Sequence, residues 1–220
     1  EQEFELKSAI AKIETQNKLQ EQRLAISRDL HDNIGSQLTF IISSIDNIKY
    51  AFDIQNAKLD SKLNGISNFA KSTIIELRDT IWAMNKNEIT FEDLQARIHN
   101  FMEKAQEAKE DIRFDFMVDA TLKSKTFSSV QGMNLYRTIQ EAINNSIKYA
   151  QPKNVTVSIQ PVESGIEITI TDNGKGFDQQ TIIMGNGILN MQKRIQDVGG
   201  HFEMDSKPNK GTTIHIRLKS

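Results

Sequence analysis

The chain has 220 residues, of which 25% are charged, and a formal net charge of −2 at pH 7. This length allows one large domain or two small ones, and the near-zero charge excludes a global basic field that would attract nucleic acid or a membrane surface. Cysteine is absent, which excludes disulfides and thiolate metal sites and fits a reducing compartment. No apolar run approaches the ~18 residues of a membrane span, and no signal peptide is visible. We therefore expect a soluble, cytoplasmic fragment of a longer protein.

Residues 1 to about 52 follow a helical pattern without proline, with Gly35 as the single glycine. Asn17 and Gln20 fall in its apolar seam, where polar side chains weaken a coiled coil but can fix its register. The seam steps by four and three, as in a heptad repeat, through Ile34, Leu38, Ile41, Ile45, Ile48 and Phe52. We expect residues 1–22 to form a coiled-coil signalling helix that continues into a longer helix.

A second helix is predicted from Lys58 to Met84, after a break near Asp53–Ala57. Two antiparallel helices cannot bury two apolar stripes by themselves, so the pattern indicates a four-helix bundle made by two copies of the chain. The stripe of this second helix consists of Leu59, Leu63, Ile66, Ala70, Ile74, Leu77 and Ile81. Residues 23–86 are therefore predicted to be a homodimeric helical hairpin, joined to the second half of the chain by a flexible segment, Asn85–Ile89.

The pattern of residues 87–220 indicates an α/β sandwich, with helices on a mixed sheet, so the whole chain is of the α+β class. Helices are predicted at Glu92–Lys109, Ser128–Ala150 and Gly187–Val198. Strands are predicted at Ile112–Val118, around residues 155–159 and 166–170, at His201–Asp205 and at Thr212–Leu218.

A polar cluster lies on the second of these helices. Glu141, Asn145 and Lys148 are four and three residues apart, so they share one helix face. An oxygen donor and an ammonium group on one face suit a metal ion held against phosphates.

Asp172 ends a strand and has the same parity as Ile166, Ile168 and Ile170, so it is predicted to point to the buried face. A buried carboxylate requires a partner, and an adenine amino group is a suitable donor. The alternative is that Asp172-Asn-Gly is merely a turn leaving a strand.

Glycines follow this aspartate. Gly174 and Gly176 can bend the chain out of the strand, and residues 178–184 then form a short lid. Gly185 and Gly187 can bring backbone N–H groups to phosphates at a helix N-terminus.

His31 is followed directly by Asp32. An imidazole can attack phosphorus through an unprotonated nitrogen, and a neighbouring carboxylate can hold the other N–H and accept its proton. One alternative is a surface histidine on a charged helix. Another is a core histidine, because the heptad register puts His31 near the seam, although Leu30 could take the core position instead.

The second half resembles the GHKL-type ATPases. Glu141…Asn145…Lys148 is similar to their N box, Asp172-Asn-Gly-Lys-Gly-Phe177 and Gly185-Asn-Gly-Ile-Leu-Asn-Met191 to their glycine boxes, and Gly211-Thr212-Thr213 to their final Gly-Thr. The resemblance implies that ATP binds here. It implies that Asn145 ligates Mg²⁺, Lys148 contacts phosphate, Asp172 reads adenine and Thr212 supports Asp172 through water. Glu141 would activate water in hydrolytic members and orient Mg²⁺-bound water in kinases.

Residues 27–38, Ser-Arg-Asp-Leu-His-Asp-Asn-Ile-Gly-Ser-Gln-Leu, resemble the phosphoacceptor helix of sensor histidine kinases. The likeness is strongest to the subfamily with NarL-like response regulators, and Leu77-Arg-Asp-Thr-Ile-Trp82-Ala-Met resembles the end of its second bundle helix. The resemblance implies phosphoryl transfer from ATP to His31 and then to an aspartate of a separate receiver domain, with Asp32 as the base. By analogy, membrane anchorage would come only from segments upstream.

One departure from this subfamily concerns phosphatase activity. The acid after the histidine is often followed four residues later by a glutamine that positions water to dephosphorylate the regulator. Here the fourth residue after Asp32 is Ser36, and Gln37 lies about 100° further round an α-helix. We therefore expect a kinase with weak or absent phosphatase activity.

Two rival functions remain open from the sequence. One is an ATPase or a serine kinase of the same fold, with the bundle serving only to dimerise it. The other is a non-catalytic interaction module with a vestigial nucleotide site.

Overall fold

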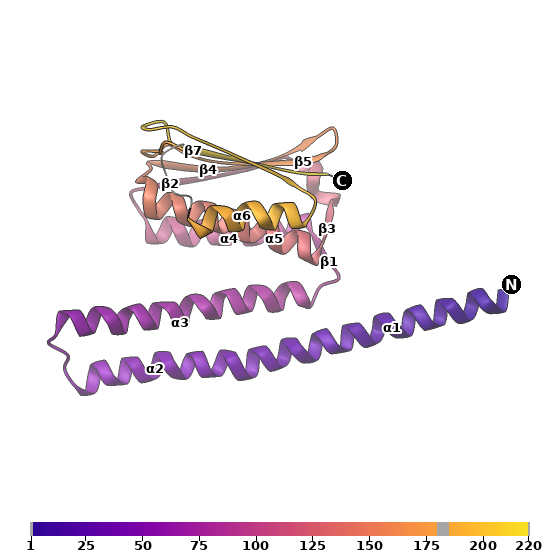
Figure 1. The fold of residues 1–220 in the computed structure, drawn as a ribbon, viewed down its shortest axis with the longest axis horizontal. Coiled ribbons are helices and arrows are strands. Elements are labelled where there is room, and N and C mark those ends of the chain that lie inside the picture. The colour runs from indigo at the N-terminus through magenta and orange to yellow at the C-terminus, as the bar shows by residue number, and fades with distance from the viewer. Residues whose placement is uncertain (1, 180–184, 220) are drawn as a thin grey trace. The chain divides into compact units, whose positions relative to one another are not determined.

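The computed structural model describes residues 2–179 and 185–219 and divides the chain into two compact units, residues 1–87 and 88–220 (Figure 1). The first unit is helical and the second combines a sheet with helices, as the sequence pattern predicts.

The first unit is a long helical hairpin. Its elements are α1 (Gln2–Asp29), a π-helical segment η1 (Leu30–Gly35), α2 (Ser36–Ala51) and α3 (Ala57–Met84). Helix α2 continues α1 as one rod, and α3 returns antiparallel to α2 (Figure 1). Within the described residues, no helix is both long and apolar enough to cross a membrane.

The π-helical segment is a departure from the continuous α-helix that the sequence predicts. Ser36 follows it directly, and the Ser36 hydroxyl donates to the main-chain oxygens of Asp32 and Asn33, the latter at 3.2 Å. Such bonds from a serine to the preceding turn compete with the regular helical ladder and disturb it. The consequence is one wider turn around His31, where an α-helical wheel no longer gives the positions of the side chains.

The turn between α2 and α3 is fixed by polar contacts. The Asn56 side chain accepts hydrogen bonds from the N–H groups of Lys58 and Leu59, which caps the start of α3. Across the hairpin, Lys49 Nζ lies 2.9 Å from Asp60 Oδ1 and donates to Asn64 at 2.7 Å. These contacts set the register in which α2 and α3 pack.

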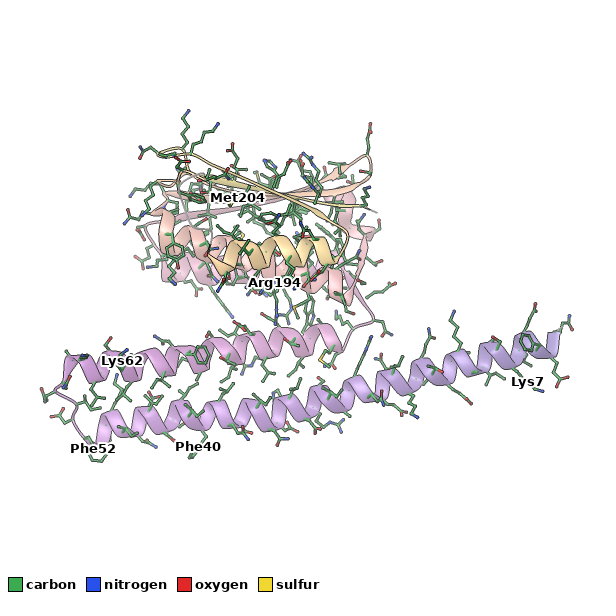
Figure 2. The ribbon with its side chains drawn as sticks, viewed as in Figure 1. Lys7, Phe40, Phe52, Lys62, Arg194 and Met204 are labelled. Carbon is green, nitrogen blue, oxygen red and sulfur yellow. The ribbon has the colours of Figure 1, made fainter. Side chains whose placement is uncertain are left out.

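The hairpin leaves most of its apolar seam uncovered in the single chain. Ile45, Ala70 and Ala83 are its buried apolar side chains among the residues described. Large apolar side chains remain exposed along all three helices, including Phe4, Leu6, Ile10, Ile13, Leu24, Ile34, Phe40, Ile41, Ile48, Leu59, Ile66 and Phe69. Phe40 projects from α2 away from α3 (Figure 2). An exposed apolar surface of this extent is typical of a face that packs against another chain.

The second unit is built on a five-stranded sheet with the order β2-β4-β5-β7-β6. Its strands are β2 (Arg113–Val118), β4 (Asn154–Val162), β5 (Gly165–Asp172), β6 (His201–Ser206) and β7 (Thr212–Lys219). Strand β2 is parallel to β4 and the other pairs are antiparallel, so the sheet is mixed, as predicted.

Three helices lie on one face of this sheet (Figure 1): α4 (Phe91–Ala108), α5 (Ser129–Asn145) and α6 (Asn186–Asp197). A short 3₁₀ helix, η2 (Ala120–Ser124), follows β2, and a second π-helical segment, η3 (Ser146–Ala150), continues α5. Alternate residues of β4 and β5 face the helices and are fully buried, among them Val157, Ile159, Ile166 and Ile168. The core therefore lies between the helical layer and one face of the sheet.

A two-stranded ribbon at the start of the second unit is not predicted by the sequence pattern. Strand β1 (Glu88–Thr90) pairs antiparallel with β3 (Thr126–Ser128), and Ile89 is 0% exposed. Ile89 packs on Gly132 of α5, where an added Cβ would lie 2.6 Å from the Ile89 Cδ1. The flexible segment predicted at Asn85–Ile89 is therefore wrong for its last two residues, because burial and strand pairing fix them in the second unit.

We predict that Ile89→Ala lowers the free energy of unfolding of the second unit by about 2–5 kcal/mol, because it removes a fully buried branched side chain. The measurement is hydrogen exchange of the β4 and β5 amides in the 220-residue chain. Val130→Ala, on the exposed side of α5, is the control and should change the free energy of unfolding by less than about 0.5 kcal/mol. Equal exchange in the two variants would contradict the packing role of Ile89.

Candidate functional sites

The second unit contains a cavity of about 500 Å³. It lies where the end of α5, the end of β5 and the start of α6 meet. The lining residues include Glu141, Asn145, Ser146, Tyr149, Asp172, Lys175, Gly176, Phe177, Gly185, Asn186, Gly187, Met191, Met204 and Thr212. The lining combines polar groups with apolar side chains, an arrangement that suits a ligand with a flat apolar part and a charged part.

Asp172 lies inside this cavity and is 4% exposed, as its strand parity predicts. Its Oδ1 accepts a hydrogen bond from the Gly174 N–H at 2.9 Å, and its Oδ2 accepts one from the Ser146 hydroxyl at 2.9 Å. Two donors stabilise the buried carboxylate, and each oxygen keeps a lone pair for a further donor in the cavity.

Ser146 is a site residue that the sequence motifs do not predict. Its side chain is 7% exposed and also lies 3.1 Å from the Ala142 carbonyl oxygen. A signal was available, because Ser146 follows Ala142 by four residues and Ile139 by seven, which puts the hydroxyl on the buried face of the helix. The motif drew attention to the neighbouring Asn145 instead.

Glycine at position 187 lets α6 approach α5 closely. A Cβ added to Gly187 would lie 2.5 Å from the Glu141 Oε1 and 3.6 Å from the Asn145 Nδ2. Gly185 is the N-cap of α6, and among the described residues no side chain caps this helix end. The N–H groups of Asn186 and Gly187 lie at the positive end of the helix dipole, and Gly187 places that end beside Glu141 and Asn145.

The structure does not bring Lys148 and Gly174 into the cavity lining of the described residues. Lys148 lies in η3, where the wider π turn rotates it away from the face of Glu141 and Asn145. Its Nζ is 5.0 Å from the centre of the Tyr149 ring. The hydrogen bond and charge interaction with Tyr149, and to a smaller extent the charge of Glu141, raise the pKa of Lys148. Lys175 lines the cavity instead.

Thr212 lies opposite Asp172 in the β5–β7 ladder and lines the cavity. Its Oγ1 is 2.9 Å from the Ser206 hydroxyl oxygen, and that hydroxyl accepts from the Phe177 N–H at 3.0 Å. Ser206 is a second residue that the sequence motifs do not predict. It joins Thr212 to the glycine segment after β5, so the two sides of the cavity mouth are linked.

Two glycines at this mouth have backbone conformations that favour glycine. Gly176 has a φ of 55° and Gly211 a φ of 75°. A Cβ on Gly176 would meet the Lys207 carbonyl oxygen, and one on Gly211 would meet the Asp172 carbonyl oxygen. Of the lid predicted at residues 178–184, residues 180–184 lie outside the described residues, while Gln179 donates to the Met204 carbonyl oxygen at 2.6 Å.

In the first unit, His31 lies within η1, and its side chain is 66% exposed. The His31 Nδ1 is 3.1 Å from the Asp32 Oδ1, so the carboxylate can hold the Nδ1–H tautomer and leave Nε2 as the nucleophilic nitrogen. Leu30 is half-buried. In the single chain His31 is therefore a surface side chain, and Leu30 is the more buried of the two.

Both halves of the chain match known protein families. Residues 22–89 match the family described as histidine kinase. Residues 131–220 match the family described as histidine kinase-, DNA gyrase B-, and HSP90-like ATPase.

Curated relatives match nearly the whole chain. The chain is 27% identical over 204 residues to an uncharacterized sensor-like histidine kinase of Chloroflexus aurantiacus. This alignment covers 90% of the chain and 34% of the relative. The chain is also 27% identical over 203 residues to the signal transduction histidine-protein kinase/phosphatase DegS of Brevibacillus brevis. This alignment covers 90% of the chain and 51% of DegS. The chain thus spans about a third to a half of the length of these relatives.

Solved structures share the fold at low sequence identity. The histidine kinase domain of a blue-light activated histidine kinase from Erythrobacter litoralis aligns with a TM-score of 0.55 at 12% identity, over 84% of this chain and 94% of that one. The histidine kinase AdeS of Acinetobacter baumannii aligns with a TM-score of 0.55 at 14% identity, over 83% of this chain and 94% of the AdeS chain. Because residues 22–89 and 131–220 match the two histidine kinase family models and the curated relatives are sensor histidine kinases, the chain belongs to the sensor histidine kinases, as a transmitter region.

Proposed function

We propose that this chain transfers the γ-phosphoryl group of ATP to His31 and then to an aspartate of a response regulator. The observation that carries the proposal is the exposed imidazole of His31 with Asp32 at its Nδ1, in a chain that also folds a cavity of about 500 Å³ lined by a buried carboxylate. The transfer requires the cavity of the second unit to reach His31 in line.

The cavity supplies each part of an ATP site. Asp172 accepts from the adenine amino group, with Ser146 and Gly174 holding the carboxylate in place. Apolar side chains such as Met191 and Ile170 cover the faces of the base. The N–H groups at the start of α6 face the phosphates, and Lys175 supplies an ammonium group in the lining. Lys148 contacts phosphate only after turning from the Tyr149 ring.

Mg²⁺ is the proposed cofactor, with Asn145 as its protein ligand and Glu141 beside it. Both side chains are half-buried, line the cavity and offer oxygen atoms. The described residues contain no group of three or more acidic or histidine side chains that could hold a metal by themselves. This donor set fits an ion that takes few protein ligands and receives the remainder from phosphate and water. Mg²⁺ bound here would neutralise phosphate charge.

At His31, the Nε2 lone pair attacks the γ-phosphorus. The N–P bond forms as the bond from the γ-phosphorus to the β-γ bridging oxygen breaks, and ADP leaves with that oxygen. Positive charge that develops on the imidazole is stabilised by Asp32 at Nδ1, which accepts the Nδ1 proton. The phosphoryl group then passes to a receiver aspartate, and His31 is restored.

The assignment of domains follows from these roles. We infer that residues 1–22 carry the input signal, that residues 23–86 dimerise and bear the phosphoacceptor, and that residues 87–220 bind ATP. The exposed apolar seam of the hairpin supports a homodimeric four-helix bundle. The partner of phosphorylated His31 is a receiver domain, and we propose the NarL-like class from the likeness of residues 27–38. We also propose that the reaction takes place in the cytoplasm and that, by analogy, membrane anchorage would come only from upstream segments.

We expect the chain, incubated with γ-labelled ATP and Mg²⁺, to take up a label that is labile in acid and stable in alkali. His31→Gln removes the nucleophile and Asn145→Ala removes the proposed metal ligand, so both should lose the label. Label that survives in His31→Gln would contradict the assignment of His31. Acid-stable label, or hydrolysis without any label, would favour the serine kinase or ATPase alternative.

We predict that Ser146→Ala weakens ATP binding about tenfold, because a hydrogen bond to a charged group is lost from the carboxylate that holds adenine. Calorimetric titration with ATP measures the effect. Ser124→Ala, at an exposed serine of η2, is the matched control and should bind as the wild type does. Equal ATP affinity in the wild type and both variants would contradict a role of Ser146 in ATP binding.

The π-helical segment leaves the expectation for phosphatase activity unchanged. In a π-helix the backbone hydrogen bond shifts from the fourth to the fifth residue, but η1 ends at Gly35, and Ser36 and Gln37 lie in α2. Ser36 stands four residues after Asp32, and its hydroxyl donates to the main-chain oxygens of Asp32 and Asn33. We propose that this position offers no side-chain amide to orient water, so the protein is mainly a kinase with weak or absent phosphatase activity.

We expect the chain to leave the loss of phosphate from its phosphorylated regulator nearly unchanged, because no amide stands four residues after Asp32 to orient the attacking water. Ser36→Ala and Gln37→Ala should behave as the wild type does. The label remaining on purified regulator over time gives the rate of phosphate loss. Rapid loss with the wild type, abolished in Ser36→Ala or in Gln37→Ala, would contradict this expectation.

A further inference from the structure

Two turns beside the ATP cavity are joined by an exposed asparagine that the motifs leave without a role. One turn, residues 150–154, leads from η3 into β4, and the other, residues 172–175, leaves β5. Asn173 Oδ1 accepts hydrogen bonds from the N–H groups of Lys153 and Asn154, each at 2.8 Å. One side-chain oxygen therefore holds the beginning of β4.

Main-chain contacts complete this connection, which we call the turn junction. The Lys175 N–H donates to the Ala150 carbonyl oxygen at 2.8 Å, and the Asn173 N–H donates to the Asn154 carbonyl oxygen at 3.2 Å. Gly174 lies against Ala150, since an added Cβ would collide with the Ala150 carbonyl oxygen. The turn after β5 therefore packs directly on the last residue of η3.

The turn junction acts on one side of the adenine pocket in particular. Asp172 is already fixed by its strand neighbours, because it pairs with Val155 and Thr212. Ser146, by contrast, lies in η3, which ends at Ala150 in the junction. The junction therefore determines how far the end of α5 stands from β5, which is the separation that the 2.9 Å hydrogen bond between Ser146 and Asp172 spans.

We propose that Asn173 is a positioning residue for adenine recognition, acting through the turn junction on the Ser146–Asp172 pair. This proposal rests on the proposed ATP site. Asn173 itself is exposed and does not line the cavity within the described chain, so it affects ATP through the residues it holds. Because its partners are main-chain N–H groups near the surface, water replaces the lost bonds in a variant and the fold persists.

Discrimination between ATP and GTP separates positioning from a general structural role. Asp172 accepts from the amino group of adenine, whereas guanine presents a carbonyl oxygen at the same position, which repels a carboxylate. Displacement of the Ser146–Asp172 pair therefore weakens ATP more than GTP. Loss of folded protein, by contrast, lowers the binding of both nucleotides by the same factor.

The experiment is calorimetric titration of the 220-residue chain with ATP and with GTP. We expect Asn173→Ala to weaken ATP binding by about three- to tenfold, the equivalent of one hydrogen bond, and to lower the ATP-to-GTP affinity ratio by a similar factor. Asn173→Asp keeps an acceptor oxygen for the two N–H groups and should restore the ratio. Asn100→Ala, at an exposed asparagine of α4, should behave as the wild type.

An unchanged affinity ratio in Asn173→Ala, or equal weakening of both nucleotides, would overturn the positioning role while leaving the ATP site intact. Failure of Asn173→Asp to restore the ratio would overturn the role of the acceptor oxygen. A wild-type chain that binds ATP no better than GTP would overturn the proposed function, and the role of Asn173 with it.

Discussion

The buried carboxylate of Asp172 joins the helical layer of the second unit to its sheet. One oxygen accepts from Ser146 at the end of the α5 helix, and the other accepts from Gly174 in the turn after β5. A carboxylate without these donors would be costly to bury, so the end of α5, the β5 strand and its turn must keep this arrangement together. The cavity exists because those three segments meet around a group that can accept further hydrogen bonds. The proposed nucleotide site and the local packing of the fold therefore depend on the same few contacts.

Both candidate sites contain a π-helical segment, whose wider turn changes which side chains share a face. In η3 it rotates Lys148 away from the face of Asn145. In η1 it carries the His31–Asp32 pair. Such turns occur often at functional sites, where an extra residue within a helix redirects side chains without ending the helix. The two segments show that motif spacing has to be interpreted on the helix that is actually formed.

The β1–β3 ribbon gives the connection between the two units a definite length. Because Ile89 is buried and paired, only residues 85–87 separate α3 from the second unit. Strand β3 leads directly into α5, whose first turn is capped by Ser128, and α5 carries Glu141 and Asn145. The chain segment that leaves the hairpin is thus packed on the helix that bears the proposed metal ligand. In a protein whose activity requires the ATP-binding unit to approach His31, a short connection restricts the orientations that this unit can sample.

The sequence by itself determined the class of the fold, the order of its elements and most of the residues at the two sites, because apolar periodicity and glycine motifs are local properties. The burial of Asp172, which follows from its strand parity, is an example that the structure confirms. Tertiary structure decided what depends on contacts between distant segments. Ser146 and Ser206 gain their roles from partners 26 and 6 residues away, and Asn173 from N–H groups 20 and 19 residues before it. The position of Lys148 and the burial of Ile89 were likewise set by a π turn and by a strand pairing, neither of which leaves a periodic signal in the sequence.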